Sequence, residues 1–337
     1  MTEADENMSH GAAPTDDAES AYNELFERVI AAHGEQMRLN ADGTLGGFYN
    51  PPVKPVLRAV RKILDDAGVA GTPKNVTGSD AYDKIGSLIL DLPQQQAREL
   101  GLQNILPPPH VHMMARQKGL FFDFRNSDII AGAASDAAHE IRARGHYLDF
   151  GCSSGRTVRT LDLAFPNAFW HGVDPVSESI QFARMMLPQA EFRVSHQSPP
   201  LAYAPETFDG IVALSIWSHF SAEAGKIWLE EMRRIVRPGG FLLFTSHGFT
   251  DIATKIRNRK APVAVFVELM AAMERDGYYF QNDIREGHRG LETQSWGTTY
   301  MSREWIIQNY LSAGWELAHW APGQWGNRQD VNVLTAV

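Results

Sequence analysis

The segment from Tyr147 to Arg156, YLDFGCSSGR, constrains the fold of this chain more than any other. A short apolar run contains the acidic Asp149, a turn with two glycines follows, and an amphipathic stretch begins after the turn. Glycine permits a tight turn and lets a ligand approach the backbone, while the N–H groups of the next helix point at that ligand. The pattern predicts the start of a nucleotide-binding α/β domain.

The spacing of the glycines indicates which kind of nucleotide is bound. A dinucleotide fingerprint has glycine at the first, third and sixth positions of the turn. These positions hold Gly151, Ser153 and Arg156, so two of the three do not match. The sequence therefore disfavours pyrophosphate binding, although an NAD-dependent oxidoreductase stays an alternative, and it points to a ligand without phosphates.

From His146 onward, short apolar runs alternate with amphipathic stretches, which is typical of a parallel sheet covered by helices. We expect strands at 147–150, 168–173, 191–195, 208–214 and 241–246, with helices at 155–165, 177–187 and 223–236. Residues 250–300 are predicted to be an insertion made of one helix, 261–275, and a loop rich in glycine and aromatic residues. A helix from Ser302 to Leu311 and two strands, at 315–320 and 331–336, complete the domain.

The region before this domain is predicted to contain two segments, a disordered tail and a helical domain or cap. Residues 1–20 contain six acidic residues and no Lys or Arg, without hydrophobic periodicity, which indicates a disordered tail. Residues 21–106 contain apolar residues at helical spacing, over 22–39, 56–67, 80–92 and 94–100, which indicates a helical domain or cap. The prolines at 107–109 mark the boundary to the α/β domain, residues 107–337.

Composition excludes several classes of function. The net charge is −9, and the chain has no basic cluster of the kind that binds DNA or RNA. One cysteine rules out an internal disulfide and suits a reducing cytoplasm. The longest apolar stretch, from Ala261 to Met273, contains Glu268 and is too short for a membrane span, and no signal peptide is evident. We therefore expect a cytoplasmic protein without nucleic-acid or membrane partners, and the sequence does not indicate its oligomeric state.

Five motifs in order resemble the class I S-adenosylmethionine (SAM) dependent methyltransferases. They are the turn described above, WHGVDP at 170–175, FDGIVALS at 208–215, LEEMRRIVRPGG at 229–240 and QDVNVL at 329–334. Within this class, the lead-in LPPP at 106–109 and the segment SIWSHFS at 215–221 are similar to a bacterial subgroup linked to saccharide and secondary-metabolite pathways. The resemblance implies a Rossmann-like fold with a seven-stranded sheet, its last strand antiparallel, and SAM as the cofactor.

The resemblance also implies which residues contact SAM: Asp149, Gly151, Cys152, Ser153, Gly155, Asp174, Pro175, Gln197, Leu214 and Ser215. Asp174 ends the second strand, where a carboxylate can accept hydrogen bonds from both ribose hydroxyls. Asp149 can accept from loop amides or act on the cofactor ammonium, and the alternative is an acid that only caps the turn. Gln197 is matched to the adenine edge, with a surface-loop role equally open.

Methyl transfer to a hydroxyl benefits from a general base, and two histidines are candidates. His219 follows the fourth strand and His247 follows the fifth, and an imidazole titrates near neutral pH. A packing or capping role is the alternative for His219. Cys152 lacks the partners of a nucleophile and is expected to be a small packing residue. His110 and His112 have no further ligand at suitable spacing, so no metal site is predicted.

These observations predict a SAM-dependent methyltransferase that acts on a hydroxyl of a small molecule or saccharide. The aromatic residues between Tyr278 and Tyr300 are expected either to form a lid over that acceptor or to pack the insertion onto the sheet. An N-methyltransferase for a small amine or a protein side chain is one alternative, and a SAM-binding module without catalysis is another.

Overall fold

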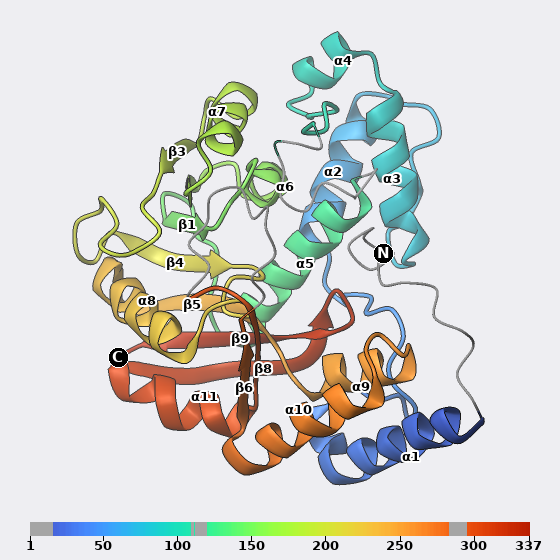
Figure 1. The fold of residues 1–337 in the computed structure, drawn as a ribbon. Coiled ribbons are helices and arrows are strands. Elements are labelled where there is room, and N and C mark those ends of the chain that lie inside the picture. The colour runs from blue at the N-terminus through green and yellow to red at the C-terminus, as the bar shows by residue number, and fades with distance from the viewer. Residues whose placement is uncertain (1–15, 109–110, 112–119, 283–294) are drawn as a thin grey trace. The chain divides into compact units, whose positions relative to one another are not determined.

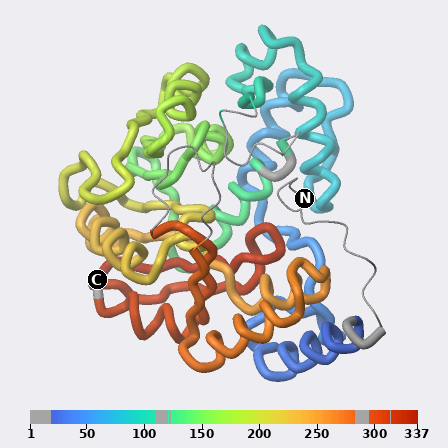
Figure 2. The backbone as a smooth tube through the Cα atoms, viewed as in Figure 1, coloured from blue at the N-terminus to red at the C-terminus, as the bar shows by residue number. Residues whose placement is uncertain are grey.

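The computed structural model of the protein describes residues 16–108, 111, 120–282 and 295–337 (Figure 1). Its internal contacts divide the chain into two units. Unit 1 contains Met1–Tyr49, Ser215–Glu230 and Phe244–Asn332, and unit 2 contains Asn50–Leu214, Glu231–Leu243 and Val333–Val337. Each unit therefore contains several separate segments of the chain, whose backbone is traced in Figure 2 with colours that follow the residue number.

Unit 2 contains a parallel sheet. Strand β1 (His146–Phe150) pairs in parallel with β2 (Phe169–Asp174) and β4 (Phe208–Ala213), and β2 pairs in parallel with β3 (Glu191–Val194). The strand order is β3-β2-β1-β4-β5, and the first part of β5 (Val236–His247) belongs to this unit. Parallel neighbours need crossover connections, which α6 (Arg156–Ala164) and α7 (Ser177–Met186) provide. The carboxyl ends of β1 and β2 therefore lie side by side.

Four more helices of unit 2 precede the sheet in the sequence: α2 (Pro55–Asp66), α3 (Asp80–Asp91), α4 (Gln94–Glu99) and α5 (Phe121–Asp136). Helix α2 begins with proline, which is pre-shaped for the first helical position, and it buries Val56, Leu57, Val60 and Leu64. The carboxylate of Asp128 in α5 accepts a hydrogen bond from the backbone N–H of Val56 at 2.7 Å and one from the Tyr82 hydroxyl at 2.9 Å. This buried carboxylate ties α2, α3 and α5 together.

Unit 1 combines helices with the remaining strands. Helices α1 (Asp16–His33), α9 (Phe249–Arg257) and α10 (Val263–Asp276) share an apolar core that contains Val29, Ile252 and Met270. Strands β6 (Tyr278–Gln281) and β7 (Thr298–Met301) are antiparallel to each other, and Tyr300 of β7 pairs with His247 of β5. Helix α11 (Arg303–Tyr310) leads through the 3-10 turn Leu311–Ala313 to β8 (Trp315–Trp325), and β9 (Gln329–Ala336) pairs with β8 and β5. Helix α8 (Ala222–Ile235) is divided between the units.

The predicted Rossmann-like α/β fold is confirmed, with differences in the insertion. The described strands number nine rather than seven, because residues 250–300 contribute β6 and β7 where a loop was predicted. The same region contains α9 as well as the predicted helix, which is observed as α10. Only residues 326–328 connect β8 to β9, and so short a connection makes these two strands antiparallel.

Two predicted boundaries differ from the structure. Residues 16–20, assigned to the disordered tail, are the start of α1, and Glu19 forms an ion pair with Arg259 at 2.6 Å; the rest of that tail lies outside the described residues. Residues 21–106 are not one helical domain, because the chain divides between Tyr49 and Asn50. None of the helices in the described ranges is both long and apolar enough to cross a membrane.

Candidate functional site

Two buried aspartates stand at the carboxyl ends of neighbouring strands in unit 2. Asp149 near the end of β1 is 4% exposed and Asp174 at the end of β2 is 7% exposed. Burial, together with the negative charge of Asp174, raises the pKa of Asp149 to about 8. Oδ2 of Asp149 is buried and has no hydrogen-bond partner among the described residues. A site with these properties gains from a ligand that brings positive charge and hydrogen-bond donors.

The loop after β1 is held against the end of β2. The backbone N–H groups of Gly151 and Cys152 both donate to the carbonyl oxygen of Val173, at 2.9 and 3.0 Å. The next N–H, from Ser153, donates to Oδ2 of Asp174 at 2.8 Å. Three successive amides are therefore oriented by the second strand before any ligand binds.

Three residues of this loop have left-handed backbone conformations. Gly151 has a φ of 80°, Gly155 a φ of 76° and Ser153 a φ of 46°. Glycine adopts this region without strain, whereas serine does not. Since serine normally avoids this conformation, the bond from its N–H to Asp174 compensates for part of the strain. Gly155 also lacks room for a side chain, because a Cβ there would lie 3.0 Å from the ring of Phe192.

Asp174 has a structural role in addition to its predicted role in ligand binding. Oδ2 accepts from Ser153, and Oδ1 accepts from the N–H of Val176 at 2.9 Å. A carboxylate oxygen can accept two hydrogen bonds, so the bonds to the loop do not by themselves exclude bonds to ribose hydroxyls. The role of Asp174 in holding a ribose stays a prediction, now joined by its role in shaping the loop.

The other residues predicted to contact the cofactor in unit 2 differ in burial. Cys152 is 5% exposed, and burial raises the pKa of its thiol well above the usual value, which agrees with a packing role rather than a nucleophilic one. Its Sγ would lie 2.8 Å from a Cβ at Gly172, so β2 needs glycine there. Pro175 and Leu214 are half-buried, and Gln197 lies exposed in the loop after β3.

Ser215, the first residue of unit 1 after β4, is also held in a left-handed conformation, with a φ of 55°. Its N–H donates to Oγ1 of Thr245 at 2.7 Å, and its hydroxyl donates to Oε1 of Gln329 at 3.2 Å. Thr245 in turn donates to the same Gln329 oxygen at 2.7 Å. This network fixes the bend of the chain where β4 ends.

His219 is anchored by a main-chain carbonyl. Its Nδ1 lies 2.7 Å from the carbonyl oxygen of Gly297, and its own carbonyl accepts from the N–H of Gly297 at 2.8 Å. The ring stacks on Trp296 with centroids 4.8 Å apart and planes 19° from parallel. A carbonyl oxygen only accepts, so Nδ1 carries the hydrogen, and the lone pair of the neutral ring is on Nε2.

His247, at the end of β5, faces a carboxylate that the sequence analysis did not identify. Its Nδ1 lies 3.1 Å from Oδ2 of Asp251, in the first turn of α9. The ring of His247 is 6.5 Å from that of His219, centroid to centroid, and perpendicular to it. The spacing of four residues between His247 and Asp251 was the available signal, but it is informative only once α9 is recognised as a helix.

Asp251 is the centre of a buried group of charges. It is fully buried and lies 3.1 Å from Nζ of Lys255 and 3.5 Å from Nε of Arg328. Burial acts to raise the pKa of Asp251, but Lys255, His247 and Arg328 outweigh it and hold that pKa well below the usual value. Burial lowers the pKa of His247, and Asp251 acts in the opposite direction. Asp251 is therefore ionised and His247 is neutral near pH 7.

A second buried carboxyl group of unit 1, that of Asp330, lies beside the turn between β5 and α9. Asp330 is 2% exposed and accepts a hydrogen bond from the N–H of Gly323 at 2.9 Å. Burial raises its pKa to about 8. Its carboxyl group occupies the space where a side chain at position 248 would begin, so Gly248 cannot be replaced without moving Asp330.

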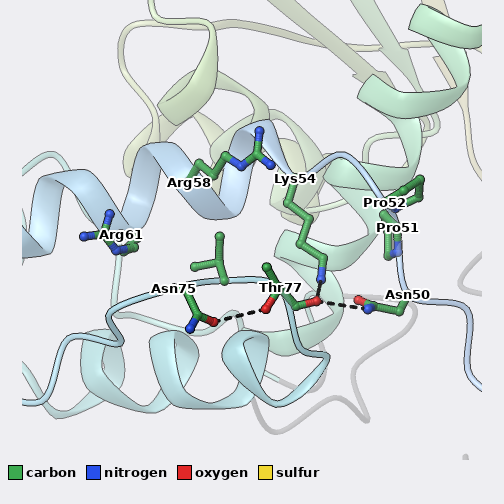
Figure 3. A pocket seen from close by; sticks show the side chains of 9 residues that line it. Asn50, Pro51, Pro52, Lys54, Arg58, Arg61, Asn75 and Thr77 are labelled. Atoms are coloured by element: carbon green, nitrogen blue, oxygen red, sulfur yellow. Dashed lines mark hydrogen bonds between the residues drawn. The ribbon is translucent and has the colours of Figure 1, made fainter.

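A cavity of about 370 Å³ in unit 2 contains none of the predicted site residues (Figure 3). Its cationic residues are Lys54, Arg58 and Arg61. Lys54 donates to the carbonyl of Thr77 at 2.7 Å, and Arg61 forms an ion pair with Asp65 at 3.1 Å. Lys54 and Arg61, two of the three cationic residues, thus already have polar partners within the protein.

No group of three or more potential metal ligands occurs within the described parts of the chain. His110 and His112, considered above as a metal pair, lie outside the described residues. The proposed lid between Tyr278 and Tyr300 is described only at its two ends, as β6 and as the stretch from Ser295 into β7. Its role as a lid stays a prediction.

Comparison with known proteins identifies the central segment. Residues 148–240 match a protein family described as "Methyltransferase domain". A segment of 75 residues is 37% identical to trans-aconitate 2-methyltransferase from Paracidovorax citrulli (strain AAC00-1) and covers 20% of this chain and 28% of that protein. The match thus spans only about a quarter of the relative's length.

Solved structures of similar proteins include a SAM-dependent methyltransferase from Methanosarcina mazei, with a TM-score of 0.43 and 18% identity, over 58% of this chain and 94% of that one. Another is a SAM-dependent methyltransferase from Clostridium acetobutylicum ATCC 824, with a TM-score of 0.42 and 11% identity, over 62% of this chain and 90% of that one.

Proposed function

We propose that the protein transfers the methyl group of SAM to a hydroxyl of a small molecule or saccharide, and the match of residues 148–240 to a family described as "Methyltransferase domain" supports this proposal. The observation that carries the proposal is the pair Asp149 and Asp174 with the preformed loop between the ends of β1 and β2. The buried Oδ2 of Asp149, which has no hydrogen-bond partner among the described residues, matches a cationic ligand, and the carboxylate of Asp174 matches one that carries hydroxyls.

The residues present fit SAM. Its ammonium group would place a positive charge near Asp149, whose Oδ2 is buried without a partner among the described residues. Its ribose hydroxyls would donate to the carboxylate of Asp174 at the end of β2. The amino-acid portion would lie against the loop at Gly151, which is partly exposed, whereas Gly155 is buried against Phe192. Exposed Gln197 is suited to contact the adenine edge.

The chemistry asks little of the protein beyond orientation and proton removal. SAM supplies, when bound, a methyl group on a positively charged sulfur atom. The acceptor oxygen would bond to that methyl carbon while sulfur keeps the electron pair of the broken carbon–sulfur bond, and a base of this chain would take the hydroxyl proton. His219 and His247 are the proposed bases, because Nδ1 of His219 is bonded to a carbonyl and Nδ1 of His247 lies 3.1 Å from a carboxylate, so that Nε2 is the nitrogen that would take the proton in each ring.

Calorimetric titration with S-adenosylhomocysteine tests the cofactor site. We expect saturable binding that is weakened roughly tenfold or more in Asp149→Asn, because loss of a charged hydrogen-bond partner costs about 1.5–3 kcal/mol. Asp162→Asn is the matched control, since Asp162 lies in α6 and its carboxylate accepts from Gln189 rather than from the loop. Wild-type protein that binds NADH and not S-adenosylhomocysteine would refute the proposal.

Assays with a panel of hydroxyl and amine acceptors then distinguish the remaining alternatives. Transfer to hydroxyls, with loss of turnover when a histidine base is replaced, supports the proposed reaction. Transfer to amines that tolerates replacement of both histidines would instead indicate an N-methyltransferase. Cofactor binding without transfer to any acceptor would indicate a binding module without catalysis.

A further inference from the structure

The imidazoles of His219 and His247, the two proposed bases, face chemically different groups within unit 1. Nδ1 of His219 is bonded to the neutral carbonyl of Gly297, whereas Nδ1 of His247 faces the ionised carboxylate of Asp251. A base must carry a positive charge after it has taken a proton, and a carboxylate stabilises that charge more than a carbonyl does. Of the two, His247 is therefore better supported as a base.

We propose that Asp251 is a positioning residue that holds His247 with its hydrogen on Nδ1, so that Nε2 is the atom that takes the proton from the acceptor. The inference rests on the proposed function for the identity of the reaction. The tautomer of His247 and its dependence on Asp251 do not depend on that reaction, and they can be measured separately.

The position of Asp251 is determined by its surroundings. Its N–H is bonded to the carbonyl of Gly248 at 3.1 Å in the first turn of α9, and its side chain lies between His247, Lys255 and Arg328. Lys255 also donates to the hydroxyl of Tyr300 at 2.7 Å, and Tyr300 is the β7 residue paired with His247. Strand β7 and helix α9 therefore fix the carboxylate from two sides.

The charges around His247 set the state in which it would act. Burial, and to a smaller extent the charges of Lys255 and Arg328, lower the pKa of His247 and so keep the ring neutral, the state that a base needs before the reaction. Asp251 raises that pKa and so favours the protonated ring that forms during the reaction. His219 and Tyr300 also contact the ring, at centroid distances of 6.5 and 5.3 Å. Replacing Asp251 or Lys255 should therefore move the pKa in opposite directions.

Nitrogen NMR of the histidine rings tests the inference without any catalytic assay. In wild-type protein labelled with ¹⁵N-histidine, we expect the ring of His247, assigned by its loss in His247→Gln, to show a protonated Nδ1 and an unprotonated Nε2. Asp251→Asn should lower the pKa of the ring, and Lys255→Met should raise it. Arg257→Gln is the control, because Arg257 is an exposed residue of the same helix.

Kinetics supply the second readout. His247→Gln should lower kcat about 10²–10⁴-fold with a smaller change in KM. The acidic limb of the kcat profile should move to lower pH in Asp251→Asn and to higher pH in Lys255→Met, which a general loss of stability would not produce. Circular dichroism shows whether each variant is folded, and the wild-type tautomer tests the inference even if the Asp251 variant is not.

The outcomes separate the inference from the proposed function. A hydrogen on Nε2 in the wild-type protein, or a pKa that moves in the same direction in both variants, overturns the role of Asp251. The expected tautomer and shifts in a protein that binds S-adenosylhomocysteine but transfers no methyl group would refute the proposed reaction and leave the arrangement of Asp251 and His247 established.

Discussion

Ser153 donates its backbone N–H to Oδ2 of Asp174 across 2.8 Å, which joins the loop after β1 to the end of β2. Asp174 thus shapes the loop, in addition to its proposed role as acceptor for the ribose hydroxyls. We predict that Asp174→Ala weakens SAM binding by about 1.5–3 kcal/mol, because two charge-assisted bonds to the ribose are lost. Titration calorimetry measures this, and an unchanged affinity would remove the ribose role.

Binding of SAM should release a proton. The pKa of Asp149 is about 8 without ligand, so this carboxyl is mostly protonated near neutral pH. A nearby ammonium favours the ionised form, which lowers the pKa and expels the proton. Calorimetry in buffers of different ionisation enthalpy should show release approaching one proton per site near neutral pH. The release should disappear in Asp149→Asn; the same release in that variant would assign the proton to another group.

The same carboxyl should make the ligand-free protein less stable at higher pH. Its folded-state pKa of about 8 lies above the ordinary value of 3.8, so the folded state binds the proton more tightly than the unfolded state. The stabilisation is present at low pH and is lost as the pH rises from about 4 to 8. Asp128 and Asp330, with raised pKa values of about 7 and 8, act in the same direction. Thermal unfolding should therefore show a smaller decline over this range in Asp149→Asn than in the wild type.

A buried cluster of ion pairs between α5 and α6 should contribute strongly to the stability of the fold. Asp123 of α5 forms an ion pair with Arg156 at 2.7 Å and another with Arg159, both in α6, and the side chain of Asp123 is 4% exposed. Asp123→Ala leaves two buried guanidinium groups without their carboxylate and should destabilise the protein by about 3–5 kcal/mol. Urea unfolding measures the loss. Asp65→Ala, which removes an exposed carboxylate from α2, should change stability by less than about 1 kcal/mol.

Removal of residues 1–20 should have little effect on stability. The deletion takes away the start of α1 and the exposed pair between Glu19 and Arg259, and such pairs contribute about 1 kcal/mol or less. The thermal midpoint should stay within a few degrees of that of the full chain. A large decrease would show that the segment packs on the rest of the protein.

The sequence predicted the strands and helices whose structure follows from the hydrophobic periodicity of their own residues. The strands and helices from His146 to Ile235 have clear periodicity, and their predicted bounds agree with the structure to within about two residues. Ser302 was predicted as an N-cap, and its side chain accepts from the N–H of Trp305 at 3.1 Å. Gly314, predicted to end that region, has a φ of 82°.

Elements that depend on distant partners were not predicted. Strands β6 and β7 are four residues each and are separated by 16 residues, so neither has a recognisable partner in the sequence. Helix α5 is stabilised by polar contacts such as Asp123 to α6 and Asp128 to α2, and its small residues give little periodicity. Helix α9 has Phe249, Ile252 and Ile256 at helical spacing, a signal that the sequence analysis did not use.

The candidate site was predictable to a similar degree. Asp149 and Asp174 were found because each is the acid at the end of a recognisable strand. The contacts between Ser215, Thr245 and Gln329 join three segments far apart in sequence, and only the folded chain brings them together. Asp251 was not predicted, because its place opposite His247 depends on helix α9, and α9 itself was not predicted.

The turn between β5 and α9 has no room for a side chain at position 248. The carboxyl of Asp330 fills the place beside Gly248, and Gly248 lies between the proposed base and the carboxylate that orients it. Any mutation there, even to alanine, would disturb the folding of the turn and the alignment of His247 at once. Random mutagenesis followed by selection for activity should therefore recover only glycine at 248, while exposed neighbours such as Arg257 vary freely.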